Sequence, residues 1–466
     1  MIEGSVYQKE ACLRGASFSF FCSYTVHILL RCGDNTGIVQ IYSRGEDRLR
    51  VLMFSWEYPP RVVGGLARHV HDLSVALVKN GVRVDVITVA EDWSAAAEEI
   101  IQGVRVLRVR PYHLVSRDFI SGILQLNLTM LEKAFSLLRQ GESYELIHAH
   151  DWLVAYASRA VKHALQLPLV ATIHATEYGR NRGLHTDEQR YISDVEWWLA
   201  YEAWRVICCS RYMHHELQRV FHLPDDKIEI VPNGVEPSQF RVSRQDASMR
   251  SRFAAADEKI VFFIGRLVQE KGVQVLLEAA PRVLAAAPKT KFVIAGKGAM
   301  LESLRGQARQ LGIESKLYFT GYIDDLTRNA LYQAAMAAVF PSLYEPFGIV
   351  ALEAMAAKVP VIVSDTGGLA EIVDHGVDGL KCYPGNAVSL ADQLITLLQN
   401  EDLAMRLAAK AAEKVESEFS WQEIANQTQN IYKQVLAEYS QCEWAGIRGD
   451  YPRPDAHIFR ELPHRH

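Results

Sequence analysis

Two runs of alternating strand and helix segments constrain what this chain can fold into. In residues 49 to about 232, short apolar segments are separated by longer helical ones, and the same alternation returns in residues 259 to about 383. Short apolar strands between helices predict a parallel sheet covered on both faces. Two such halves predict a cleft between them, a favoured place for a ligand. The predicted fold class is therefore α/β, with two doubly wound domains facing a cleft.

The alternation predicts individual elements. Strands are expected at residues 49–55, 82–90, 104–108, 146–149, 169–174 and 206–209, and in the second half at residues 260–264, 291–295, 317–319, 337–340 and 361–363. Helices are expected at residues 66–79, 120–139, 152–165 and 186–204. Ligands of such sheets bind at the carboxyl ends of the strands, so the loops that follow the strands hold the candidate residues.

Turn residues and composition mark the domain boundaries. The segment Pro-Asn-Gly-Val-Glu-Pro at residues 232–237 predicts a linker, which places one domain at residues 49–232 and the next at residues 233–418. A long helix is expected at residues 419–440. Residues 441–466, with three prolines and three late histidines, are expected to form an exposed tail.

Residues 1–48 do not share the pattern of the rest. They hold three of the seven cysteines and show no clear helical or strand period. Their apolar part, residues 16–30, is diluted by Ser, Cys, Tyr and His, lacks a small-residue cleavage site and is too short to span a membrane. We hypothesise that residues 1–48 are a translated upstream region or a disordered extension, and that the working protein starts near Leu49. The mass of the natively expressed protein checks this.

Composition excludes several classes of function. The chain has 466 residues, 49% of them hydrophobic, which is enough for two or three cores. A net charge of −5 gives no reason to expect a nucleic-acid partner. The seven cysteines form neither a Cys-x-x-Cys motif nor a disulfide framework, which favours a cytoplasmic location. No Asp-x-Asp follows a strand and no histidine-rich cluster is visible, so we expect no metal and no cofactor.

The stretch Pro-Ser-Leu-Tyr-Glu-Pro-Phe-Gly-Ile-Val-Ala-Leu-Glu-Ala-Met-Ala-Ala, at residues 341–357, predicts an anion site. Pro346 and Gly348 suit a turn that feeds a helix, whose unpaired N–H groups and dipole would hold a diphosphate. Glu353, about a turn and a half into that helix, could take both hydroxyls of a ribose. Glu345 could face a sugar beyond the diphosphate. Alternatively, both are ordinary acids near a helix start.

Further candidates follow other predicted strands. Gly64 and Gly65 open a helix after the first strand, where backbone without a side chain can approach a ligand. Arg266 and Lys271 flank a helix start in the second half, and both could neutralise the charge on one departing diphosphate. Gly298, after the next strand, is expected to line the nucleotide pocket.

Polar residues also end two strands of the first half. In His148-Ala-His-Asp-Trp152, Asp151 could cap the following helix, and with His150 it is an acceptor-side candidate; the alternative is that both are structural. His174 ends the next strand, and Glu177 follows it in a loop that could touch an acceptor.

Together these motifs resemble those of retaining glycosyltransferases of family 4, which have the GT-B fold of two Rossmann-like domains. The resemblance rests on the Glu-x7-Glu arrangement with Pro-Phe-Gly inside it, on Gly-Arg with Lys-Gly five residues later, and on the first glycine pair. It covers residues 49 to about 439. It implies that residues 232–237 are an interdomain hinge and that the helix at residues 419–440 crosses back to the first domain.

The resemblance also implies roles for the candidates. The implied catalytic residues are Glu345, His174, Arg266 and Lys271. The implied donor-binding residues are Gly64, Gly65, Arg266, Lys271, Gly298, Glu345, Phe347, Gly348, Ile349 and Glu353, and the acceptor-side residues are His150, Asp151 and Glu177. No metal or cofactor is implied, because an ADP-, UDP- or GDP-hexose is itself the donor substrate.

The implied activity is a retaining transfer of a hexose, above all glucose, to a hydroxyl of a glucan or other glycan. The segments Trp-Glu-Tyr-Pro-Pro at residues 56–60 and His-Ala-His-Asp-Trp at residues 148–152 resemble glycogen and starch synthases. One departure is Val62, which stands where bacterial glycogen synthases carry a lysine. Transfer to a lipid, a small sugar or a cell-surface glycan is the alternative. A nucleotide-sugar 2-epimerase fits less well, because it would need catalytic acids suited to elimination and not the Glu-x7-Glu arrangement. A non-catalytic nucleotide-sugar binder fits less well, because it gives no reason for the full set of charged residues.

Overall fold

The computed structural model describes residues 49–92, 95–112, 114–116, 118–240 and 247–442, together with the backbone of residues 17–20, 25–32 and 35–42. Residues 1–49 and residues 50–466 are two separate units. In the first unit, β1 (Ser17–Phe20), β2 (Thr25–Cys32) and β3 (Asn35–Tyr42) form an antiparallel sheet in that order. These strands go beyond the prediction for residues 1–48, whose place outside the working protein stays a prediction. The predicted tail lies outside the described residues from residue 443 onward.

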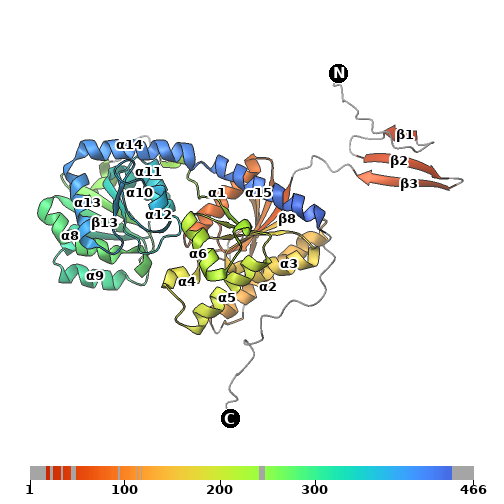
Figure 1. Ribbon diagram of the computed structural model, residues 1–466, viewed down its shortest axis with the longest axis horizontal. Helices are drawn as coiled ribbons and strands as arrows, with labels where there is room; N and C mark the ends of the chain where they lie inside the picture. The colour runs from red at the N-terminus through yellow and green to blue at the C-terminus, as the bar shows by residue number, and fades with distance from the viewer. Residues whose placement is uncertain are drawn as a thin grey trace, which may run out of the picture. The chain divides into compact units, whose positions relative to one another are not determined.

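The first half of the second unit is built on an eight-stranded sheet in the order β11-β10-β9-β8-β4-β5-β7-β6. Every pairing is parallel except that of β6 with β7. Its strands are β4 (Arg50–Ser55), β5 (Arg83–Val89), β6 (Glu98–Ile101), β7 (Val104–Val109), β8 (Leu146–His150), β9 (Leu169–Ile173), β10 (Arg205–Cys208) and β11 (Ile228–Ile230). Its main helices are α1 (Gly65–Lys79), α2 (Phe119–Arg139), α3 (Ala155–Leu165), α4 (Glu177–Asn181), α5 (Asp187–Glu202) and α6 (Arg211–Phe221). Helices cover both faces of this sheet, as its buried strands require (Figure 1).

The second half repeats the plan with a six-stranded, fully parallel sheet in the order β14-β13-β12-β15-β16-β17. Its strands are β12 (Lys259–Ile264), β13 (Thr290–Ala295), β14 (Leu317–Gly321), β15 (Ala335–Phe340), β16 (Val361–Ser364) and β17 (Leu380–Cys382). Its helices include α8 (Val273–Ala286), α9 (Leu301–Gln310), α10 (Asp325–Ala334), α11 (Ile349–Ala356), α12 (Gly367–Ile372), α13 (Ala387–Gln399) and α14 (Glu401–Glu418). The prediction of two parallel α/β domains is confirmed.

Three short edge strands, β6, β11 and β17, go beyond the predicted set. Burial in β6 alternates between exposed and half-buried positions, so its four residues carry no continuous apolar run. Strands β8 and β9, in contrast, are buried at every position, and β9 is recognisable as an apolar run. Because β4, β8 and β9 pair in parallel and in register, the residues after them meet at one edge of the sheet.

The long helix α15 (Trp421–Gln441) lies against the first half. It packs against α1 (Figure 1). The Tyr432 hydroxyl lies 2.6 Å from His148 Nδ1, and Trp204 Nε1 donates to Glu438 at 2.8 Å. Beside the start of α15, Val235 N–H donates to the Phe419 carbonyl at 3.0 Å, and Val235 forms a parallel bridge with Ser420. The two passages of the chain between the halves are therefore bonded to each other.

No helix in the part of the chain that the structure describes combines the length and apolar character needed to cross a membrane. The predicted cytoplasmic location stays a prediction.

Candidate active site

The predicted anion site lies at the start of α11. Gly348 is the N-cap residue and has a φ of 115°, a conformation that glycine adopts far more readily than other residues. The loop ahead of it is held by the first half of the unit: Ser210 Oγ donates to the Pro346 carbonyl at 2.7 Å, and the Tyr344 hydroxyl donates to Glu216 at 2.8 Å. The N-terminus of α11 is thus anchored at the junction of the two halves.

A partly buried ion pair joins two of the predicted catalytic residues. Lys271 Nζ lies 2.7 Å from Glu345 Oε2, and the Ser342 hydroxyl donates to the same carboxylate oxygen at 3.1 Å. The side chains of Lys271 and Glu345 are only 20% and 9% exposed. Their loops meet because Leu343 N–H donates to the Glu270 carbonyl at 2.7 Å. A lysine and a glutamate 74 residues apart therefore share one site.

Arg266 lies in the loop that carries Lys271. Its guanidinium donates to Glu270 at 3.2 Å, and its side chain is 48% exposed, so it can leave this partner readily for an anionic ligand. Gly298 packs behind the loop: a Cβ there would lie 2.2 Å from the Leu267 carbonyl oxygen. Gly298 is thus needed for close contact between two loops of the second half.

Glu353, the second acid of the motif, lies in a group of charged side chains. Its Oε1 accepts from Arg68 NH1 at 2.6 Å, and its Oε2 accepts from the Tyr332 hydroxyl at 3.1 Å. Arg68 comes from α1 in the first half and also bonds Asp325 at 2.7 Å. Arg328, which is buried, lies 3.8 Å from the same Glu353 oxygen. Positive charge from both halves of the unit therefore faces this carboxylate.

The first glycine pair faces α11 from the opposite half. A Cβ on Gly65 would lie 3.2 Å from Ile349 Cδ1, whereas a Cβ on Gly64 would meet no atom within 4 Å. The Glu57 carboxylate accepts from the N–H groups of Val63 and Gly64 at 2.8 and 3.0 Å, and burial raises the pKa of Glu57. Glu57 thus holds the glycine loop in place. It accepts a hydrogen bond from the N–H of Gly64, a residue predicted to bind the donor.

Histidines gather beside this loop. The rings of His150 and His174 are stacked with centroids 5.6 Å apart, and His69 of α1 lies 4.5 Å from His174. Burial and the nearby Arg180 lower the pKa of His174 to about 3, so its imidazole is neutral at physiological pH. A neutral imidazole can still donate one hydrogen bond and accept another, as contact with a sugar hydroxyl requires.

The prediction that Asp151 caps a helix is wrong. Asp151 has a φ of 61° and makes no capping bond; its carboxylate instead accepts from the His174 backbone N–H at 2.7 Å. The chain turns sharply after β8, which aims this side chain at the neighbouring strand end. Burial raises the pKa of Asp151 to about 6. Glu177 begins α4 nearby, where its N–H donates to Glu196.

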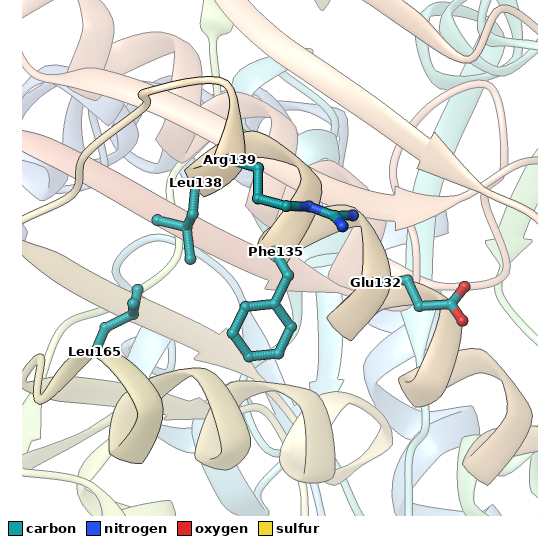
Figure 2. Close-up of a pocket in the computed structure, with 5 residues that line it drawn as sticks. All are labelled: Glu132, Phe135, Leu138, Arg139 and Leu165. Atoms are coloured by element: carbon teal, nitrogen blue, oxygen red, sulfur yellow. The ribbon is translucent and has the colours of Figure 1, made fainter.

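A shallow groove lies elsewhere, between α2 and α3. It is lined by Glu132, Phe135, Leu138, Arg139 and Leu165. Figure 2 shows the Phe135 ring and Leu138 on α2 directed toward α3. None of the predicted site residues lines it, so this groove is not the candidate active site.

Comparison with known proteins agrees with the geometry. The model for Glycosyltransferase Family 4 matches residues 63–239, and the model for Glycosyl transferases group 1 matches residues 244–414. The chain is 39% identical to an uncharacterized glycosyltransferase of Methanocaldococcus jannaschii, over 83% of this chain and 98% of that protein. It is 36% identical to the glycogen synthase of Mycobacterium tuberculosis, over 82% of this chain and 94% of that protein. The chain belongs to the glycosyltransferases of the glycogen and starch synthase type.

The solved sucrose-phosphate synthase of Thermosynechococcus elongatus aligns with a TM-score of 0.72 and 26% identity, over 84% of this chain and all of that one. The predicted GT-B fold of this glycosyltransferase is thereby confirmed.

In this glycosyltransferase, the loop with Arg266 and Lys271, which packs on Gly298, meets the loop with Glu345 that leads into α11. Phe347 and Gly348 precede α11, and Ile349 and Glu353 lie in it. His150, Asp151 and His174 form a second group, in the first half. Arg68, Glu57 and His69 also contact these groups but are not among the predicted site residues. The signal that could have found two of them is position: Arg68 and His69 follow Gly65 by three and four residues, near the start of α1.

Proposed function

We propose that this glycosyltransferase moves a hexose, glucose above all, from a nucleotide-sugar to an acceptor hydroxyl with retention of configuration, in the manner of glycogen and starch synthases. The observation that carries the proposal is the Lys271–Glu345 ion pair at the N-terminus of α11. It combines a cation for a diphosphate with a carboxylate for a sugar. Identity to a glycogen synthase supports the choice of glucose and of a glucan acceptor.

In the proposed reaction, the bond between the sugar's anomeric carbon and the diphosphate oxygen breaks while the acceptor oxygen bonds to the same carbon on the same face. The acceptor proton passes to the leaving diphosphate. Lys271 and Arg266 stabilise the negative charge that develops on that group, which is where fixed charges accelerate a reaction most. Glu345 and His174 hold the sugar, and closure of the halves excludes the water that would hydrolyse the donor.

The test is nucleoside diphosphate release from UDP-, ADP- and GDP-hexoses, with and without an α-glucan. Release from a glucose donor that rises with glucan supports the proposal, and proton NMR of the fresh product checks that an α-linked donor gives an α-linked sugar. If the rate of nucleoside diphosphate release does not change when glucan is added, the acceptor is instead a lipid, a small sugar or a cell-surface glycan. A new sugar formed without any acceptor would indicate an epimerase, and binding without release would indicate a non-catalytic binder.

Replacing Arg68 by glutamine is expected to tighten the binding of a nucleoside diphosphate by about two- to fivefold, the size of a partly exposed ion pair. Glu353 Oε1 is bonded to Arg68, and the proposed ribose contact requires this carboxylate. The donor must therefore displace Arg68 or share Glu353 with it. Calorimetric titration with UDP and ADP measures the change. Arg282→Gln, which removes a pair with Asp392 on the surface of the second half, is the matched control. Weaker binding in Arg68→Gln would mean that Arg68 holds the nucleotide itself.

A further inference from the structure

Three histidine side chains converge inside the first half from three different elements. His69 projects from α1, His150 ends β8, and His174 follows β9. One ligating ring nitrogen of each lies within 4.8 Å of those of the other two. His150 Nδ1 and His174 Nε2 are 3.3 Å apart. The three histidines are separated in the sequence, but their rings lie close together in the structure.

Two of these imidazoles have buried nitrogens without a hydrogen-bond partner. His69 Nδ1 lies 2.6 Å from Asn233 Oδ1, an oxygen that can only accept, so Nδ1 carries the proton and Nε2 has the free lone pair. His69 Nε2 is buried and unpaired, and so is His150 Nε2; the residues are 3% and 0% exposed. Buried polar atoms without partners are unfavourable and rare, and they indicate a ligand or an ordered solvent molecule.

We propose that His69, His150 and His174 form a binding site for a divalent transition-metal ion, with Zn²⁺ as the best match. Zn²⁺ is bound by neutral imidazole nitrogens, and three protein ligands with an open fourth position are a recurrent zinc arrangement. The Asn233 oxygen bonded to His69 Nδ1 is the kind of outer partner that orients a metal-bound histidine. This proposal does not depend on the function proposed above.

The neighbours of the cluster define the ligand set. Burial first, and then the neighbouring charges, hold the pKa values of all three histidines well below the usual range, so the rings are ready to bind a cation without losing a proton. His148 stacks on His150 but is not a ligand, because its two nitrogens are bonded to Tyr432 and Thr172. Asp151 is turned to the His174 backbone N–H.

Bound metal would join α1 to the carboxyl ends of β8 and β9. Ligation through the ring nitrogen of His174 that faces His150 would set the orientation of that ring and leave its other nitrogen for a substrate hydroxyl. The ion would therefore act on stability and on the alignment of His174, and the charge on the leaving diphosphate would still be met by Arg266 and Lys271.

The test is titration of the tag-free, chelator-treated full chain with Co²⁺, whose visible absorption reports nitrogen ligation. We expect one equivalent to be bound in the wild type and displaced by Zn²⁺. We expect His69→Gln to lose this one bound Co²⁺ ion and His71→Gln to keep it. His71 lies on the same helix as His69 and pairs with Asp72. The three histidines after residue 450 are common to all variants, so the difference between variants isolates the site.

Thermal or urea unfolding gives a second readout. Free Zn²⁺ at about 100 times its dissociation constant should lower the unfolding equilibrium constant of the wild type about 100-fold. No such protection is expected for His69→Gln. Absence of the cobalt spectrum in the wild type overturns the proposal, whatever the variants do, and leaves ordered solvent as the partner of the unpaired nitrogens. Equal binding by wild type and His69→Gln overturns it as well.

Discussion

Replacement of Lys271 by alanine is expected to lower kcat by about 10²- to 10³-fold, the range found when one fixed charge-stabilising donor is removed from an active site. Lys271 lies 2.7 Å from Glu345, and it is the less exposed of the two cations in its loop. Its loss would leave the departing diphosphate facing Arg266 alone and Glu345 without its cation. Steady-state nucleoside diphosphate release measures the loss, and it should appear mainly in kcat because the charge develops in the transition state.

A drop in activity must be separated from a drop in stability, since Glu345 is buried and would lose its partner. Urea unfolding of Lys271→Ala therefore accompanies the kinetics, and the assay is run well below the unfolding midpoint. Lys289→Ala, which removes an exposed pair with Asp257, is the matched control and should keep wild-type turnover. Near-normal kcat in a folded Lys271→Ala protein would rule out the proposed role of the ion pair.

Acidification is expected to reduce the free energy of unfolding steeply below about pH 6.5, the usual pKa of a histidine. Burial holds the pKa values of four histidines well below that value; these are His69, His148, His150 and His174. Each stays neutral in the folded state but binds a proton on unfolding. The unfolded chain therefore gains protons, and stability that is complete above pH 6.5 is lost as the pH falls.

Buried acids near the histidines have the opposite effect on the pH dependence of stability. Burial raises the pKa of Asp151 to about 6, so between its usual pKa and pH 6 the folded state holds a proton that the unfolded chain releases. Burial also raises the pKa values of Glu196 and Glu57, which oppose the histidines in the same way. Near pH 5, the four histidines and these three acids leave a net uptake of roughly two protons, or a slope of about 3 kcal/mol per pH unit. Urea unfolding at several pH values, followed by tryptophan fluorescence, gives the slope.

A matched pair of variants assigns this slope to the buried cluster. His148→Gln should reduce the proton uptake by about one, because His148 is fully buried between Tyr432 and Thr172. His185→Gln changes an exposed histidine and should leave the slope unchanged. A slope near zero between pH 5 and 6 would show that the buried imidazoles are already charged in the folded protein.

Residues within one loop could be predicted from the sequence better than residues from different elements. The turn at Gly348 and the helix after it follow from local preferences, and both are found. Strand β9 was predictable because only one of its five residues is polar, and β8 because it opens with two apolar residues between predicted helices. The role of Asp151 could not be predicted. An aspartate that caps a helix and one that accepts a hydrogen bond from the neighbouring strand end look the same in the sequence, and only the backbone turn after β8 distinguishes them.

The missed residues share a physical cause. Arg68 and Glu353 are bonded although they lie 285 residues apart in the sequence. His69 contacts His174 only because α1 packs beside the strand ends. No local period marks such pairs, since they depend on the placement of whole elements. An arginine and a histidine on an amphipathic helix are ordinary surface residues until that placement is known.

The bond between the two passages of the chain at Val235 and Phe419 has a kinematic consequence. If the two chain segments that join the halves lay far apart, they would restrict bending between the halves. A single connecting segment would also allow one half to rotate relative to the other. Because these two run side by side in a parallel bridge, they define one line about which the halves can bend while the bond persists. The motion of one half relative to the other can then be described by a single hinge angle. A single distance across the opening, measured in solution, would suffice to follow it.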